Sequence, residues 1–286
     1  LKYMEKKKSI FDNTIVSLVL LVLAFIVGMV VFGGISGAIR AITTGDPMAT
    51  TEVGQALDSF IVSVGGAVVS VFVAKKMYKD EYTTGLGSEG LSDGFKYMAT
   101  LFIVAVVAFI ISLLSGSFFV TGDKLIAAFL TAATAGIFEE LVFRSGFCGL
   151  LMRKGHKDAK GVWIAVIVYA LVFGAVHAGN SAMTGGEMPS VIIWQIFQAI
   201  AVGLLFGAAF VRSKNVWGCI TSHFIFDLAI MILMKDEMAI MYTSDMSILD
   251  TIETIAIAIV CLGAALYLLR PAKMQEAIEK WSVKEA

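Results

Sequence analysis

Long apolar runs separated by short polar segments dominate the sequence. A transmembrane helix needs about 20 consecutive apolar residues. Runs near that length lie at 14–38, 57–74, 97–120, 125–152, 161–179, 190–211, 216–234 and 248–269. The pattern predicts an all-α polytopic membrane protein with about eight transmembrane helices. It also predicts a single integral-membrane domain over residues 1–286, without internal repeats or a separate soluble domain.

The composition excludes an ordinary soluble domain. Hydrophobic residues make up 58% of the chain, charged residues only 16%, and the mean hydropathy is +0.85. The net charge is −1, and the basic residues are dispersed rather than clustered, so no nucleic-acid partner is expected. The lipid bilayer is the partner that the composition implies, and we expect a multi-pass protein of the cell membrane if the source is prokaryotic.

Basic residues alternate between the polar segments and predict the orientation. Eighteen Lys and Arg residues fall in the N-terminal arm, in alternate loops and in the C-terminal tail. The intervening loops hold only Arg40, Lys124 and Lys235. Because cytoplasmic loops carry an excess of Lys and Arg, both termini are predicted to be cytoplasmic.

The cysteines, one glycine-rich stretch and one G-x-x-x-G spacing are interpreted as structural rather than catalytic. The cysteines, Cys148, Cys219 and Cys261, have no C-x-x-C spacing and are interpreted as packing residues. The stretch Asp80 to Gly94 is rich in Gly, Ser and acidic residues and predicts a surface loop. Gly203 to Gly207 has the G-x-x-x-G spacing that lets two helices approach closely.

Charged residues in the middle of the apolar run 125–152 are the first candidates for chemistry. A charge near the bilayer centre costs about 3 kcal/mol on insertion scales, so it usually marks a functional site. Glu140 and Arg144 have the i, i+4 spacing of a helical ion pair. Glu139 points about 100° away on the helix and is left as the candidate general base.

Two of the three histidines lie in other apolar runs. His223 and Asp227 form a second i, i+4 pair, in which the carboxylate can orient the imidazole. His177 ends a third run in the sequence FGAVH. A lone histidine of this kind is usually a hydrogen-bonded interior residue, but six ionisable groups on three apolar runs favour one shared polar site.

These residues carry a resemblance to a known family. EELVFR at Glu139 to Arg144, FGAVH at Phe173 to His177 and HFIFD at His223 to Asp227 resemble the three ordered motifs of the CAAX protease and bacteriocin-processing family. That family, also called CPBP or Abi, comprises intramembrane endopeptidases and includes the type II CAAX prenyl proteases. The resemblance implies an eight-helix fold with a catalytic core at about residues 125–234.

The third motif departs from the prenyl-protease pattern. Asp227 stands where that branch usually has Asn, and an ionised Asp cannot donate the hydrogen bond that Asn can. An oxyanion role for Asp227 would require a protonated carboxyl, whereas orienting His223 would not. The departure puts membership of the CAAX-cleaving branch in doubt.

The mechanism implied by the resemblance is attack by water on a peptide carbonyl. Glu139 would activate the water with help from His177, and His223 would stabilise the negative charge that develops, with Asp227 beside it and Glu140 and Arg144 in support. No cofactor is favoured. Zinc held by Glu139, His177 and His223 is the alternative, since two imidazoles and a carboxylate resemble a catalytic zinc set.

The substrate is expected to be a membrane-associated peptide or protein, either a prenylated CAAX protein or a peptide precursor. The resemblance to prenyl proteases favours a cavity that opens to the cytoplasm. Two non-catalytic alternatives remain open: an immunity or scaffold protein that keeps the charged residues as structural pairs, and a transporter that uses them as a relay.

Overall fold

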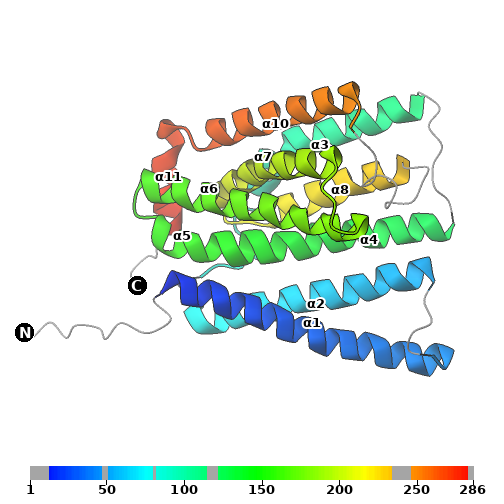
Figure 1. The fold of residues 1–286 in the computed structure, drawn as a ribbon. Coiled ribbons are helices and arrows are strands. Elements are labelled where there is room, and N and C mark those ends of the chain that lie inside the picture. Colours follow the sequence, from blue (N-terminus) through cyan, green and yellow to red (C-terminus); the bar gives the residue numbers. More distant parts are fainter. Residues whose placement is uncertain (1–12, 47–50, 80–81, 115–121, 234–245, 283–286) are drawn as a thin grey trace, which may run out of the picture.

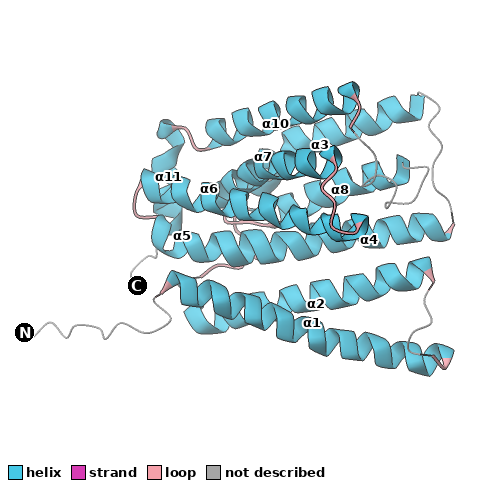
Figure 2. Cartoon of the chain, viewed as in Figure 1, coloured by secondary structure: helices cyan, strands magenta, loops and turns pink. Residues whose placement is uncertain are grey.

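The computed structural model describes residues 13–46, 51–79, 82–114, 122–233 and 246–282. Within these ranges the regular structure is entirely helical (Figure 2). The elements are α1 (Thr14–Thr44), α2 (Glu52–Tyr78), α3 (Leu91–Leu114), α4 (Asp123–Glu139), η3 (Glu140–Cys148), α5 (Gly149–Gly155), α6 (Ala159–Val176), η4 (His177–Thr184), α7 (Ser190–Ser213), α8 (Trp217–Leu233), α10 (Ile248–Leu268) and α11 (Pro271–Trp281).

Long helices run roughly along one direction and form a bundle, with α1 and α2 along one side of it (Figure 1). By length and hydropathy, six helical stretches among the described residues could cross a membrane, including the continuous stretch Asp123–Gly155 that joins α4, η3 and α5. The protein is therefore an all-helical, multi-pass membrane protein, as the apolar pattern predicts. The number of spans and the cytoplasmic location of the termini stay predictions.

Several helices are capped at their N-termini by a polar side chain. Asn13 accepts a hydrogen bond from the Ile15 amide at the start of α1, and Asp158 accepts one from Gly161 at the start of α6. Such caps satisfy amide groups that have no partner inside the helix.

The segment predicted as a surface loop is only partly one. Residues 82–90 are described as irregular, and α3 already begins at Leu91. Tyr82 is 2% exposed and Gly85 is buried. The interpretation as an exposed loop was wrong for these positions because the segment runs over the α7–α8 turn and hydrogen bonds to it, a long-range contact that turn signals do not reveal.

Helix α8 starts after a buried turn, in which Asn215 and Val216 are 0% exposed, although its first residue, Trp217, is 40% exposed. At about 1.5 Å per residue, Glu139 lies about 24 Å from the end of its continuous helix at Gly155. By the same rise, His223 lies only about 9 Å from the first residue of α8. The two side chains nevertheless meet, because the α7–α8 turn is recessed and α11 crosses the end of the bundle over it (Figure 1).

Close packing of α4 on α8 brings the two charged helices together. A Cβ atom on Gly136 would lie 3.0 Å from the Phe224 amide nitrogen and 3.1 Å from the Ile220 carbonyl oxygen. Small residues permit such backbone approach between membrane helices. Gly136 precedes Glu139 by about one helical turn, so this contact fixes the distance between the acidic residues of α4 and η3 and the histidine of α8.

Candidate functional site

A fully buried ion pair lies at the centre of the site. The Arg144 Nε atom is 2.8 Å from Glu140 Oε2, and both side chains are 0% exposed. The guanidinium carbon also lies 4.1 Å from the ring centroid of Phe173 and 4.7 Å from that of Phe206. Contacts with ring faces offset part of the cost of burying the cation. The i, i+4 pair predicted from the sequence is confirmed.

The helix that carries this pair changes its winding at the site. Residues Glu140–Cys148 are π-helical, between two α-helical segments. Such π segments are rare and occur often at functional sites. The structure compensates for the altered backbone at Ser145, whose carbonyl accepts a hydrogen bond from Tyr82 Oη at 2.7 Å and whose hydroxyl donates to the Thr84 carbonyl at 2.5 Å. Sequence reasoning missed this feature because nothing local to the segment predicts it.

His223 lies among three carboxylates. Its Nδ1 atom is 2.8 Å from Glu140 Oε1, and its Nε2 atom is 3.4 Å from Asp227 Oδ2 and 3.9 Å from Glu139 Oε2. A carboxylate paired with arginine accepts hydrogen bonds only, so Nδ1 must donate to Glu140. Glu140 thus holds the His223 ring more closely than Asp227 does. The sequence did not suggest this role, because 83 positions separate Glu140 from His223.

Glu139 faces the same point from α4. Its side chain is 21% exposed, and within the described part of the chain its Oε2 atom is buried without a hydrogen-bond partner. The groups that interact with it electrostatically are His223, His177, Asp227 and Arg144. As the helical spacing predicts, Glu140 rather than Glu139 forms the ion pair with Arg144. Glu139 is left with a carboxylate oxygen that can bind a water molecule or a substrate proton.

His177 and the α8 residues line one cavity of about 240 Å³. His177 begins η4, and its Nδ1 atom lies 2.8 Å from the Phe173 carbonyl oxygen. Since a carbonyl only accepts, Nδ1 donates and Nε2 keeps its lone pair. His223 and Asp227 line the same cavity. Glu139, Glu140 and Arg144 are not among its lining residues and join the group through their contacts with His223 and with each other.

The zinc alternative stays a prediction. Among the described residues, no group of three His, Cys, Asp or Glu side chains is placed to hold a metal ion. The Nδ1 atoms of His177 and His223 face protein acceptors, and this leaves each Nε2 atom free, as in histidines that bind a metal.

Comparison with known proteins agrees with the motifs. A family model described as Type II CAAX prenyl endopeptidase Rce1-like matches residues 121–229, just over a third of the chain. Neither a curated protein nor a solved structure gave a significant match. The matched segment contains all three motifs and all six charged or imidazole groups of the site. The match supports membership of the CAAX protease and bacteriocin-processing family for the part of the chain that holds the site.

Proposed function

We propose that the protein is a metal-free, glutamate-dependent intramembrane endopeptidase. The observation that carries the proposal is the carboxylate of Glu139. Its Oε2 atom has no hydrogen-bond partner within the described residues and lies 3.9 Å from an imidazole that a buried ion pair orients. A general base must lie within reach of the proton that it abstracts and must not be neutralised by a fixed cation. Glu139 meets both conditions, whereas Glu140 is committed to Arg144.

The reaction proceeds by addition of water to a peptide carbonyl. Glu139 removes a proton from a water molecule, and the oxygen adds to the carbonyl carbon. His223 acts as the imidazolium, which donates from Nδ1 to Glu140 and from Nε2 to the resulting oxyanion. His177 Nε2 accepts a hydrogen bond from the water. Glu139 then returns the proton to the amine as the carbon–nitrogen bond breaks. Asp227 is assigned to orienting His223, because an ionised carboxylate cannot itself donate to an oxyanion.

An apolar groove beside the catalytic cavity suits a membrane-associated substrate. It lies between α7 and α10, has a volume of about 310 Å³, and shares Trp194, Gln198 and Thr254 with the cavity. Its other lining residues are hydrophobic. We assign this groove to the apolar part of the substrate, so that a lipid-embedded segment can lie there while its peptide bond reaches Glu139.

Truncation of the oxyanion donor tests the mechanism. His223→Ala should lower the cleavage rate by about 10² to 10³, the usual cost of removing one preorganised donor. The measurement is the hydrolysis of membrane-anchored quenched peptides by purified protein in liposomes. His156→Ala is the matched control, because His156 lies outside the cavity and only bonds to the Met152 carbonyl. A His223→Ala rate equal to that of the control would contradict the assignment.

Chelation separates the glutamate mechanism from the zinc alternative. We expect the activity to survive prolonged treatment with 1,10-phenanthroline and subsequent gel filtration, because no step uses a metal. Elemental analysis of the purified protein should find far less than one zinc ion per chain. Loss of activity that is restored specifically by added zinc would instead assign Glu139, His177 and His223 as ligands.

A further inference from the structure

A groove of about 550 Å³ lies where the α10–α11 junction meets the turn between α5 and α6. Helix α11 crosses the end of the bundle next to this turn (Figure 1). All the residues that line the groove belong to the described part of the chain, and none of them lines the catalytic cavity. The proposed peptidase mechanism gives this groove no role.

One wall of the groove is apolar and continues onto the outer surface of the bundle. Leu269 and Met274 line it and are 1% and 5% exposed, whereas Leu266 at its edge is 51% exposed. Trp163 lines it from α6, and the next residue, Ile164, is 50% exposed. Helices α6 and α10 are both long and apolar enough to cross a membrane. The exposed apolar side chains beside the groove therefore face lipid, and an acyl chain can enter the groove from the side.

Aromatic side chains place the groove at the level of the lipid headgroups. Trp163 lies in the second turn of α6, and Tyr267 is the second-last residue of α10. Trp and Tyr are enriched where a transmembrane helix meets the membrane–water interface. The Arg270 guanidinium carbon lies 3.9 Å from the centroid of the Tyr267 ring, and Arg270 donates a hydrogen bond to the Tyr267 carbonyl. The guanidinium is thus held at the height of the interface.

The polar rim of the groove carries a net positive charge. Lys157 lines it from the α5–α6 turn and Arg270 from the α10–α11 junction. Among the lining residues, all of which are described, Asp158 is the one acid. Its Oδ1 atom caps α6 by accepting a hydrogen bond from the Gly161 amide at 2.7 Å. The rim is therefore suited to an anionic group with several acceptor oxygens, such as a phosphate.

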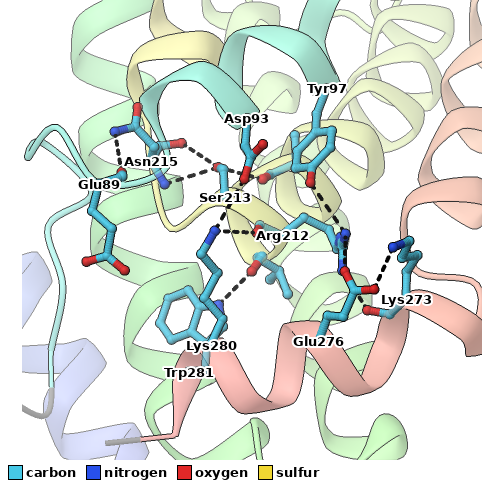
Figure 3. A network of polar contacts seen from close by, with 12 residues as sticks. Glu89, Asp93, Tyr97, Arg212, Ser213, Asn215, Lys273, Glu276, Lys280 and Trp281 are labelled. Atoms are coloured by element: carbon cyan, nitrogen blue, oxygen red, sulfur yellow. Dashed lines mark hydrogen bonds and ion pairs between the residues drawn. The ribbon is translucent and has the colours of Figure 1, made fainter. Parts of the chain in front are cut away.

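Helix α11 is fastened to the bundle, so that the groove is preformed. Arg212 donates to the Lys273 carbonyl at 2.7 Å and to Glu276 Oε2 at 3.1 Å, and the Trp281 indole donates to the Val211 carbonyl at 2.7 Å (Figure 3). Hydrogen bonds from Lys273 and Arg212 lower the pKa of Glu276, so this carboxylate stays ionised near neutral pH and keeps its contact with Arg212.

We propose that the groove binds one anionic phospholipid, with its phosphate on Lys157 and Arg270 and an acyl chain along Leu266 and Trp163. Basic pockets between transmembrane helices are known to bind anionic headgroups, above all on the cytoplasmic side. The two segments that form the groove, 153–160 and 270–281, together hold seven basic and three acidic residues. The occupant is a lipid rather than a free phosphate, because the apolar wall is continuous with the lipid-facing surface. The proposal is independent of the peptidase activity.

Tryptophan quenching by brominated lipid tests the proposal. The protein is placed in phosphatidylcholine vesicles that contain a small fraction of phosphatidylglycerol or phosphatidylcholine with brominated acyl chains. Bromine quenches an indole only at close range. The brominated phosphatidylglycerol should quench with an apparent affinity about ten-fold or more tighter, because two basic residues bind its headgroup. This extra quenching should disappear in Trp163→Phe and persist in Trp217→Phe, since Trp217 lies at the α7–α8 turn and does not line the groove.

Two double variants separate the groove from the general positive charge of this end. Lys157→Gln with Arg270→Gln should abolish the preference for phosphatidylglycerol. Lys154→Gln with Lys160→Gln is the matched control, because it removes the same charge from exposed positions beside the groove that do not line it. This control should keep the preference.

Three results would overturn the proposal. One is equal quenching of the native protein by the two brominated lipids. Another is extra quenching that survives in Trp163→Phe, since the lipid would then lie elsewhere. The third is loss of the preference in both double variants, which would trace it to the surface charge as a whole. Peptide cleavage is not read in any of these experiments, so each result leaves the peptidase proposal untouched.

A second measurement uses the native protein alone and covers the case in which the groove variant does not fold. Short-chain phosphatidylglycerol added to the protein in detergent should raise its thermal midpoint by about 3 °C or more, because a ligand that binds only the folded state stabilises it. Short-chain phosphatidylcholine and glycerol 3-phosphate should not. An equal rise with glycerol 3-phosphate would assign the groove to free phosphate, and an equal rise with phosphatidylcholine would show that the charge is not recognised. Either result overturns the proposal.

Discussion

Glu139→Gln should abolish peptide cleavage while leaving the protein folded. The amide keeps the size and shape of the carboxylate but cannot accept the proton of an attacking water, and general-base catalysis typically contributes 10² to 10⁴ in rate. We expect a loss of about 10³-fold or more, larger than that of His223→Ala, because Glu139 both starts the reaction and returns the proton to the leaving amine. The assay is hydrolysis of a membrane-anchored quenched peptide in liposomes.

The thermal stability of Glu139→Gln should not fall with its activity. In the native structure the Glu139 Oε2 atom is buried and lacks a hydrogen-bond partner within the described residues, so a neutral amide costs no buried charge. The thermal midpoint of Glu139→Gln should therefore equal or exceed that of the native protein. Glu52→Gln, at an exposed position in the first turn of α2, is the matched control and should leave both rate and midpoint unchanged.

The same variant distinguishes the three functional alternatives. A scaffold or immunity protein would tolerate Glu139→Gln, because the Oε2 atom has no hydrogen-bond partner among the described residues and its contact with His223 is as long as 3.9 Å. A transporter would show no peptide hydrolysis with either the native or the variant chain. Full cleavage by Glu139→Gln would exclude the glutamate mechanism.

The sequence predicts which residues form the site better than it predicts how they meet. Glu140 and Arg144 lie one helical turn apart, so their ion pair follows from local geometry. The contact between Glu140 and His223 does not, because it joins η3 to α8 across 83 positions. It depends on Gly136, on the recessed start of α8 and on the π-helical winding after Glu139, and each of these depends on tertiary packing.

The cover over the α7–α8 turn also separates what the sequence predicts from what it does not. Basic residues along the chain predict which end of the bundle is cytoplasmic, since that bias acts on short loops. They say nothing about which segments cover that end. The cover depends on α11 and on the Asn215 side-chain amide, which donates to the carbonyls of Gly87 and Glu89. The sequence of segment 82–90 alone suggests an exposed loop.

Arg144→Met should destabilise the protein by about 3–5 kcal/mol, the usual cost of leaving one partner of a buried ion pair uncompensated. Glu140, which is 0% exposed, would keep only His223 as a partner. Arg144→Lys should recover part of this loss, because an ammonium keeps the charge but cannot spread over the rings of Phe173 and Phe206. The measurement is thermal unfolding in detergent.

The double variant Glu140→Met with Arg144→Met separates stability from catalysis. Replacing both members of a buried pair by apolar residues often restores stability, so its midpoint should lie above that of Arg144→Met. Its cleavage rate should nevertheless stay low, because His223 loses the carboxylate that holds Nδ1 at 2.8 Å. Recovery of both the midpoint and the rate would show that the pair serves the fold alone. Recovery of the midpoint without the rate would assign Glu140 as the residue that positions His223.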